Sequence, residues 1–521
     1  MEPVLLVGGL AVALALAILA RRFDLPYPIL FVVGGTALAF VPGIPPVHIS
    51  PDWIFLAVLP PLLFSAAWST DWALFRENLP VVLQLAIGLV VVTTIVIALV
   101  AHAIVPGMAF AAAFALGAIV SPPDAVAAAA SFERFAVPRR IRGIIEGEAL
   151  VNDATALVIY GYAVAAVIAG AAFSIRGAVW SFVLVAAGGV LIGYVVARVV
   201  ELLSRTLARY DLSDSLIDNL LLIGAPYLAY LSGQALHVSG VLAVVVAGVS
   251  LSRRSSVVYG PQTRLIAYNV WTLWIYLLNA YVFLAIGLQL RAFVAQGSRL
   301  FDALPAALLI SAVVIAVRFA WIYPASWATH YVRSLRASDP GVPRAWLTVI
   351  GWSGMRGIVS LAAALALPSH FPAREIIVFI TFVVIFVTLV GQGLTLNPLL
   401  RALHVEEASD DERHEIEIRT RALEAGVARI DELAAHATDP HEREDLAQLR
   451  HEYESRIAHL RAGGEGDHRP MLADVTHDYA EKEALRAERF AIMRLRDGGE
   501  IPDDIFRRIQ YDLDLAESRL S

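Results

Sequence analysis

Residues 142–161, RGIIEGEALVNDATALVIYG, place several polar side chains inside a sequence that is otherwise mostly apolar. Glu146, Glu148 and Asp153 carry carboxylates, and Asn152 adds an amide. A carboxylate at the centre of a bilayer costs about 2.5 to 3.5 kcal/mol on an insertion scale, so three of them roughly cancel the hydrophobic gain that inserts one helix. The segment therefore predicts a helix whose polar groups are enclosed by neighbouring helices.

The composition predicts a membrane protein with a water-facing tail. Hydrophobic residues make up 58% of the 521 residues, and the mean hydropathy is +0.67. Residues 1–401 hold 23 Arg and no Lys against 17 Asp and Glu, a net charge of +6, whereas residues 402–521 hold 17 Lys and Arg against 30 Asp and Glu, a net charge of -13. We expect a polytopic membrane domain over 1–401 and a charged cytoplasmic tail over 402–521. The absence of cysteine excludes disulfides and thiolate metal sites.

Apolar runs of spanning or near-spanning length predict about thirteen transmembrane helices. Loops after odd-numbered runs carry fifteen Arg and loops after even-numbered runs carry four, which places the amino terminus outside and the tail inside. The first run follows MEP rather than a basic region, so we expect no cleaved signal peptide. The runs are 3–20, 28–41, 52–69, 79–104, 108–130, 142–169, 178–206, 214–232, 238–252, 265–289, 304–332, 343–367 and 375–400.

Two of these runs contain interruptions that ordinary spanning helices avoid. Residues 117–130 read GAIVSPPDAVAAAA, with two prolines before Asp124, and residues 351–360 read GWSGMRGIVS, with three glycines around Arg356. Proline removes a backbone donor and clashes with the preceding turn, so the helix opens there. The two runs hold corresponding positions in two sets of six, which favours an inverted-repeat transporter with two unwound, crossing helices at its midplane site.

The chemistry of such a site follows from its oxygen atoms. A partly hydrated, buried carboxylate holds a proton or a cation, but not both. Sodium is a hard cation that binds carboxylate, carbonyl and water oxygens, which Asp153, Asp124 and the opened backbone near Ser121 can supply. If Asp153 is the only exchanging group, one proton replaces one monovalent ion. The residues thus predict electroneutral exchange of one ion for one proton.

Three motifs resemble the electroneutral sodium/proton exchangers of the monovalent cation/proton antiporter family, in its bacterial branch. They are SPPDAVA at 121–127, EGEALVNDA at 146–154 and GMRGIVSLA at 354–362. LPPLLF at 59–64 and NAYVFLAIGLQL at 279–290 extend the resemblance over nearly all of residues 1–401.

The resemblance implies roles for single residues. Asp153 matches the aspartate that takes a cation or a proton, and Asn152 matches the asparagine found beside it in electroneutral members. Asp124 matches the acidic residue of the unwound helix. Glu148 matches a glutamate that pairs with the arginine at Arg356.

The resemblance also implies an architecture and a physiology. We expect a homodimer in the plasma membrane, in which a core domain moves against a dimerising panel by an elevator mechanism. It would exchange Na⁺ or Li⁺ for H⁺ in pH homeostasis, with no cofactor, no enzymatic activity and no nucleic-acid partner. Departures at Pro123, Ala149 and Ser65 each remove a polar group that many members have, which leaves the ion selectivity open.

Several alternatives stay open at this point. The same scaffold could carry K⁺, or it could be a non-transporting ion sensor that signals through the tail. An intramembrane aspartyl protease needs two facing aspartates and is disfavoured because no GxGD sequence lies in the apolar runs of residues 1–401. Glu148 with Arg356 could form a purely structural ion pair, and Asp124 could only cap a half-helix. Glu146 and Arg318 have no predicted partner.

The tail predicts a small helical domain, either regulatory or dimerising, or else a solvated segment without a regulatory role. Residues 415–437, 442–462 and 481–501 have apolar side chains at three- and four-residue steps with charges between them. Breaks are expected at Asp439-Pro440, Gly463-Gly464 and Gly498-Gly499.

Overall fold

A computed structural model describes residues 3–23, 25–42, 50–132, 135, 137–169, 175–295, 298–334, 342–405, 410–462 and 475–520. Within these residues the secondary structure is helical throughout, which confirms the predicted all-α class. The elements of the membrane part are α1 (Pro3–Arg22), α2 (Tyr27–Leu38), α3 (Pro51–Trp53), π-helix η1 (Ile54–Val58), α4 (Leu59–Ser69), α5 (Trp72–Leu83), π-helix η2 (Gln84–Leu89), α6 (Val90–Ile104), α7 (Phe110–Val120), α8 (Ala125–Phe132), α9 (Arg139–Ala169), α10 (Ile175–Arg209), α11 (Ser215–Ala235), α12 (Gly240–Ser252), α13 (Ser255–Val258), α14 (Pro261–Ala295), 3-10 helix η3 (Ser298–Ala303), α15 (Leu304–Ser334), α16 (Arg344–Trp352), α17 (Ile358–Leu365), α18 (Arg374–Phe386), π-helix η4 (Val387–Gln392) and α19 (Gly393–Leu403).

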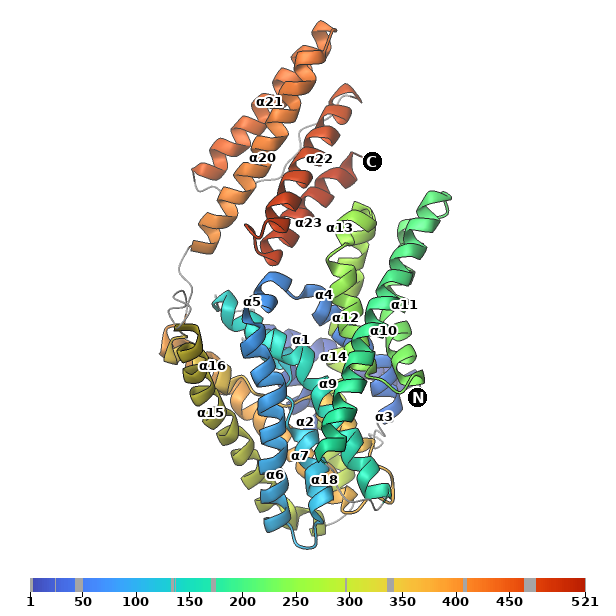
Figure 1. Cartoon of the computed structure of the whole chain (residues 1–521), viewed down its shortest axis with the longest axis vertical. Coiled ribbons are helices and arrows are strands. Elements are labelled where there is room, and N and C mark those ends of the chain that lie inside the picture. Colours follow the sequence, from blue (N-terminus) through green and yellow to red (C-terminus); the bar gives the residue numbers. More distant parts are fainter. Residues whose placement is uncertain are drawn as a thin grey trace.

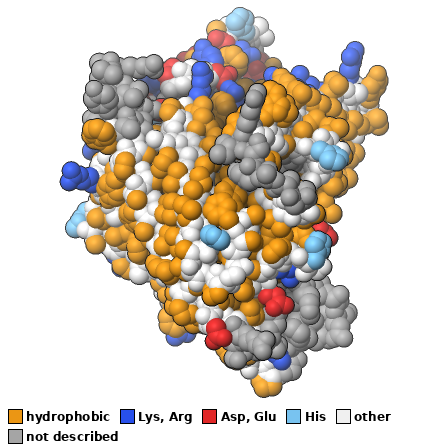
Figure 2. All heavy atoms as spheres, turned by 60° about the horizontal axis from the view of Figure 1, so that its bottom comes forward, with side chains coloured by type: hydrophobic (Ala, Val, Ile, Leu, Met, Phe, Trp, Pro, Cys, Tyr) orange, Lys and Arg blue, Asp and Glu red, His pale blue; other side chains and the backbone are white. Residues whose placement is uncertain are grey.

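Each of the thirteen predicted apolar runs coincides with one helix or with consecutive helical segments. In the described part of the chain, eight helical segments are long and apolar enough to cross a membrane, and three shorter apolar helices accompany them. The count of thirteen crossings stays a prediction. Large apolar side chains such as Leu14, Trp180 and Leu191 are exposed on the flanks. Figure 2 shows a surface covered largely by hydrophobic side chains, with basic and acidic side chains mixed at the tail end.

The membrane part divides into two groups of helices that pack mainly among themselves (Figure 1). We call α1, α2, α4, α10, α11, α12 and α14 the scaffold bundle, and α5 to α9 with α15 to α19 the core bundle. Close packing inside the scaffold bundle depends on glycine where α2 crosses α14. A Cβ at Gly35 would overlap the carbonyl of Leu284, and a Cβ at Gly287 would overlap the carbonyl of Val32. The residues predicted to carry the function all lie in the core bundle.

The described residues of the tail form four helices: α20 (Asp410–His436), α21 (Pro440–Arg461), α22 (Val475–Asp497) and α23 (Asp503–Arg519). The first three cover most of the predicted amphipathic segments, although the third segment was expected to continue to residue 501 and α22 ends at Asp497, and α23 was not predicted. Asp439 caps α21 by accepting from the N–H of His441 at 3.0 Å. Gly499 takes a left-handed conformation, with φ +75°, in the turn before α23. The predicted break at Gly463-Gly464 lies outside the described residues.

Candidate functional site

The two interrupted helices open where the sequence predicts, and the two openings touch. Residues 121–124 separate α7 from α8, and residues 353–357 separate α16 from α17. The backbone N–H of Asp124 donates to the carbonyl oxygen of Met355 at 2.6 Å. Two helices that break at the same depth therefore cross at their breaks and satisfy part of each other's backbone.

Arg356 fills the remaining space at this crossing. Its side chain is 1% exposed and donates from Nε to the carbonyl of Val120 at 2.9 Å, from Nη2 to that of Ser121 at 3.1 Å, and from Nη1 to that of Gly354. Its backbone N–H donates to Thr388 Oγ1 at 3.0 Å, on the π-helix η4. One arginine thus donates to carbonyls that both helix breaks leave without helical partners.

Ser121 belongs to the same hydrogen-bond network. Its hydroxyl donates to the carbonyl of Ala118 at 3.0 Å, and its own carbonyl accepts from Arg356. Both polar groups of Ser121 therefore have protein partners in this conformation. The predicted role of Ser121 as a cation ligand stays a prediction.

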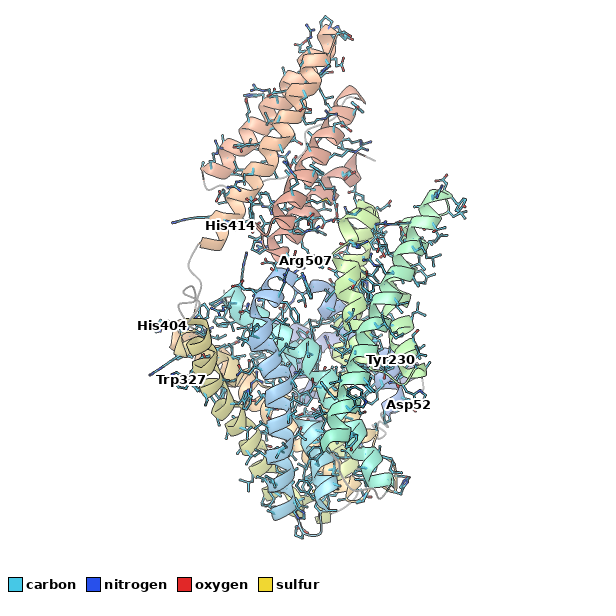
Figure 3. The ribbon with its side chains drawn as sticks, in the orientation of Figure 1. Asp52, Tyr230, Trp327, His404, His414 and Arg507 are labelled. Atoms are coloured by element: carbon cyan, nitrogen blue, oxygen red, sulfur yellow. The ribbon has the colours of Figure 1, made fainter. Side chains whose placement is uncertain are left out.

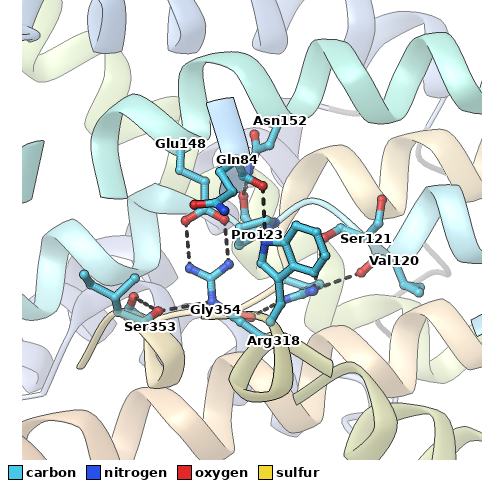
Figure 4. A network of polar contacts seen from close by, with 12 residues as sticks. Gln84, Val120, Ser121, Pro123, Glu148, Asn152, Arg318, Ser353 and Gly354 are labelled. Atoms are coloured by element: carbon cyan, nitrogen blue, oxygen red, sulfur yellow. Dashed lines mark hydrogen bonds and ion pairs between the residues drawn. The ribbon is translucent and has the colours of Figure 1, made fainter. Parts of the chain in front are cut away.

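The predicted ion pair between Glu148 and Arg356 is wrong, because Glu148 pairs with Arg318 instead. Arg318 Nη1 and Nη2 lie 2.6 and 2.7 Å from Glu148 Oε1 and Oε2, a bidentate pair of two side chains that are almost fully buried (Figure 4). Arg318 Nε donates to the carbonyl of Ile350 at 3.1 Å. The physical reason is that backbone carbonyls already occupy the guanidinium of Arg356.

Gly354 makes this arrangement possible. A Cβ at this position would overlap the Arg318 side chain and lie 3.1 Å from Arg356 Nη1. Both arginines therefore approach the unwound segment because it has no side chain at residue 354. Arg318 is the main site residue that sequence reasoning left without a role; its signal was a charge inside an apolar run, which normally finds a buried partner.

Asn152 links α9 to the break between α7 and α8. Its side chain is 0% exposed, and Nδ2 donates to the carbonyl of Pro123 at 3.0 Å (Figure 4). Its Oδ1 is buried and has no hydrogen-bond partner. Asn152 therefore positions α9 against the unwound segment and keeps one oxygen available to a ligand.

The two aspartates of the site differ in their protein partners. Asp124 Oδ1 accepts from the N–H of Val126 at 2.9 Å and so caps α8, while Oδ2 is buried without a partner. Asp153 is partly exposed, and among the described residues its carboxylate has no hydrogen bond and no ion pair. Gly357 lies directly against Asp124, since a Cβ there would overlap Oδ2. A capping role for Asp124 thus accounts for only one of its oxygens.

The oxygen atoms of these three side chains are of a kind that binds a hard cation. Asp153, Asp124 Oδ2 and Asn152 Oδ1 are hard oxygen donors of the kind that Na⁺ binds. Within the described residues, no group of three or more His, Cys, Asp or Glu could hold a metal ion.

A large cavity leads from the tail side toward this site. Its volume is about 2100 Å³, and its lining includes Ser65 of α4, Leu150 and Val151 of α9, and several residues of α23. Asp153 follows Leu150 by three residues, so the two side chains lie on the same side of α9, about 4.5 Å apart along its axis. The cavity therefore reaches the turn of α9 that carries Asp153.

An all-helical membrane protein in which two broken helices cross beside a carboxylate without a protein partner has the architecture of a secondary transporter. The family model for the sodium/hydrogen exchanger transmembrane region matches residues 9–402. The chain belongs to this family of sodium/hydrogen exchangers, within the monovalent cation/proton antiporters, as the motifs predicted.

Sequence identity to other proteins supports this membership. A sodium/proton exchanger of Mycobacterium tuberculosis is 32% identical over 543 residues, covering 99% of this chain and 97% of its own length. The exchanger YjcE of Escherichia coli is 31% identical and covers 96% of this chain and 94% of its own. A sodium, potassium, lithium and rubidium/proton antiporter of Bacillus pumilus is 33% identical over 75% of this chain and 61% of its own. The first two similarities extend over the tail as well.

The fold matches a solved structure. The sodium/proton antiporter MjNhaP1 of Methanocaldococcus jannaschii superimposes with a TM-score of 0.59 at 17% identity, covering 78% of this chain and 100% of that one. At this identity the comparison shows the shared fold alone.

Proposed function

We propose that the protein exchanges Na⁺ for H⁺ across the plasma membrane, one for one, with Asp153 as the group that carries each in turn. The observation that carries this proposal is the carboxylate of Asp153, which has no protein partner among the described residues, beside the orphaned Oδ2 of Asp124. Asn152 and Asp124 complete the binding of the cation. Glu148 with Arg318, and Arg356, hold the site's geometry.

The charges of the site support electroneutral exchange. Asp124, Glu148 and Asp153 carry three negative charges, and Arg318 and Arg356 carry two positive ones, so the empty site has one unbalanced negative charge. One monovalent ion or one proton neutralises it. Either loaded form then has the same net charge, which makes a cycle of one ion against one proton electrically silent.

The same charge balance explains why the empty binding site would not cross the membrane. A net charge at the bilayer centre costs about 2.5 to 3.5 kcal/mol on insertion scales, which slows movement of the empty site by about 100-fold. Loaded sites move without this cost. Exchange is then obligatory, because the site returns only after it has taken up the other cargo.

We propose that the core bundle carries the site by an elevator movement against the scaffold bundle. The division of the helices into two bundles, and a cavity that extends from α23 to Leu150 and Val151 of α9, support this mechanism. We further propose a homodimer formed through the scaffold bundle, with the amino terminus outside and the tail in the cytoplasm, acting in pH homeostasis.

The direct test is exchange in proteoliposomes with a pH-sensitive dye inside. We expect an outward Na⁺ or Li⁺ gradient to acidify the lumen for the wild type, with separate K⁺ samples to determine selectivity. Asp153→Asn should abolish the signal, whereas Asp52→Asn, a matched change of an exposed aspartate on α3, should retain it. Exchange by Asp153→Asn at the wild-type rate would refute the proposal.

Electroneutrality is tested separately by imposing a membrane potential with valinomycin under Na⁺/H⁺ exchange conditions. The expected rate does not change with the potential. A rate that follows the potential would show that more than one group exchanges protons. Asp124→Asn in the same assay would then identify the second group.

A further inference from the structure

Helix α23 lies where the tail meets both bundles of the membrane part. Ile505, Phe506, Ile509 and Leu513 are buried in the core of the tail domain. The apolar face of α23 is therefore used inside the tail. Its polar face is left to contact the membrane part.

The first turn of α23 binds the first turn of α5 in the core bundle. Asp503 Oδ2 accepts from the backbone N–H of Trp72 at 2.8 Å, and Asp71 Oδ2 accepts from the backbone N–H of Asp503 at 3.0 Å. Asp71 Oδ1 also caps its own helix through the N–H of Leu74 at 2.9 Å. Each helix thus supplies a carboxylate to an N–H that the other helix cannot satisfy internally.

The next turn of α23 binds the segment that joins the two bundles. Arg507 Nη2 and Nη1 donate to the carbonyls of Ser69 and Thr70 at 2.5 and 3.4 Å. Ser69 ends α4 of the scaffold bundle, and α5 of the core bundle begins at Trp72. Figure 3 shows Arg507 at this junction, between the tail helices and the membrane part.

The later turns of α23 bind α14 in the scaffold bundle. Asp514 is 2% exposed and accepts from Arg264 Nε at 2.8 Å and from Nη2 at 2.5 Å. Arg489 of α22 lies 2.7 Å from the same carboxylate. The rings of Tyr511 and Tyr268 pack with centroids 5.2 Å apart. This end of α23 is the more deeply buried one.

We propose that α23 is a strap across the seam between the bundles, which holds the conformation with the tail-side cavity open and leaves the core bundle in each exchange cycle. Asp503 and Asp514 are eleven residues apart, so the strap spans about 16 Å. The inference rests on the proposed function, because a strap matters only if the bundles move against each other. Residues of α23 also line the cavity, so its movement changes the entrance.

The exposures of the contacts identify the end that detaches. Besides the two capping bonds, the core end has an ion pair of 3.4 Å between Arg139 and Asp504, whose side chains are 20% and 37% exposed. At the scaffold end, the side chains of the corresponding ion pair, Arg264 with Asp514, are 10% and 3% exposed. Water replaces the partners of exposed groups more easily than those of buried groups. The strap therefore stays on α14 and leaves α5.

The chain has no cysteine, which permits a direct test by cross-linking the full-length protein in proteoliposomes. One double variant, Asp71→Cys with Asp503→Cys, joins the core end. The other, Tyr268→Cys with Tyr511→Cys, joins the scaffold end. Each is assayed before and after a short bifunctional thiol reagent, so that every sample is its own control.

The core-end link should reduce Na⁺/H⁺ exchange at least tenfold, and the scaffold-end link should leave the rate within twofold. Exchange that continues through the core-end link, or equal inhibition by both links, would overturn the strap. A wild type that shows no Na⁺/H⁺ exchange at all would instead count against the proposed function. The two failures are therefore distinguishable.

An unlinked variant tests the same strap from the opposite direction. Asp503→Ala removes the acceptor for the Trp72 N–H, so the core end detaches more readily and the exchange rate should rise severalfold. Glu432→Ala, which removes an exposed carboxylate of α20, is the matched control and should not change the rate. A rate for Asp503→Ala equal to that of the control would contradict the proposal.

Discussion

The pairing of Glu148 with Arg318 rather than with Arg356 makes a quantitative prediction about stability. Two charge-assisted hydrogen bonds of 2.6 and 2.7 Å join side chains that are 1 to 2% exposed. Removing one partner of such a buried pair costs about 3 to 5 kcal/mol, because the other charge stays buried without compensation. We expect this loss for Glu148→Ala, and a similar loss for Arg318→Met.

The two changes together should cost much less than the sum of the single costs. Once both charges are absent, no uncompensated ion is left, so the coupling free energy between the two positions should be about 3 kcal/mol. The corresponding cycle of Glu148→Ala with Arg356→Met should give about 1 kcal/mol or less, since Arg356 bonds to backbone carbonyls.

The assay is reversible unfolding of the purified protein in mixed micelles, with the denaturing detergent fraction as the variable. The single variants, the two double variants and the wild type provide both cycles under one condition. A coupling free energy between Glu148 and Arg356 that exceeds the one between Glu148 and Arg318 would refute the assignment. A cost of the double variant equal to the sum of the two single costs would refute the ion pair itself.

Three further changes test separate parts of the structure. Gly357→Ala would push its methyl group into Asp124 Oδ2, so the exchange rate should fall by about tenfold or more, equivalent to about 1.4 kcal/mol. The control Gly391→Ala, whose methyl group would meet open space, should exchange at the wild-type rate. Normal exchange by Gly357→Ala would show that Asp124 is not held against residue 357. Asn152→Ala leaves the Pro123 carbonyl without its donor and should lower the free energy of unfolding by about 1 to 3 kcal/mol in mixed micelles, and an unchanged stability would contradict that bond. In the tail, burial and the charge of Glu488 hold the pKa of the Tyr453 phenol well above its ordinary value of 10.0. The folded tail keeps this proton and the unfolded tail releases it, so the stability contributed by the protonated phenol is present below pH 10 and is lost as the pH rises above it. Limited proteolysis of the full-length protein at about pH 9 to 11 should therefore show tail cleavage rising with pH in the wild type and much less so in Tyr453→Phe, and identical profiles would contradict the burial argument.

Much of the fold was predictable because hydrophobic length and helix-breaking residues are local signals. The thirteen apolar runs coincide with helical segments, and both interruptions fall where proline or glycine prevents a regular helix. Helix α23 was missed although Ile505, Phe506, Ile509 and Leu513 repeat with helical spacing after Pro502. Its many charged residues made the amphipathic pattern hard to recognise. The residues of α5 and α14 that it contacts are hundreds of positions away in the sequence.

The candidate site was predictable as a set of residues but not as a set of contacts. Asp124, Asn152 and Asp153 were identified because polar groups in apolar helices are costly and need a reason. Which arginine reaches Glu148 depends on the rotation of three helices about their axes. It also depends on the absence of a side chain at Gly354. Neither quantity can be read from the spacing of residues within one helix.

The crossing of the broken helices explains why Arg356 could not also pair with Glu148. Each break leaves carbonyl oxygens that no water in the hydrocarbon core can satisfy, and the donors of one guanidinium reach both breaks at once. A second arginine was therefore needed for the glutamate, and Arg318 of α15 supplies it. In the proposed mechanism the two arginines also balance two of the three carboxylates, which would leave a single negative charge for the cargo to neutralise. In that proposal the same pair of side chains would serve both the unwound backbone and the charge balance of the exchange.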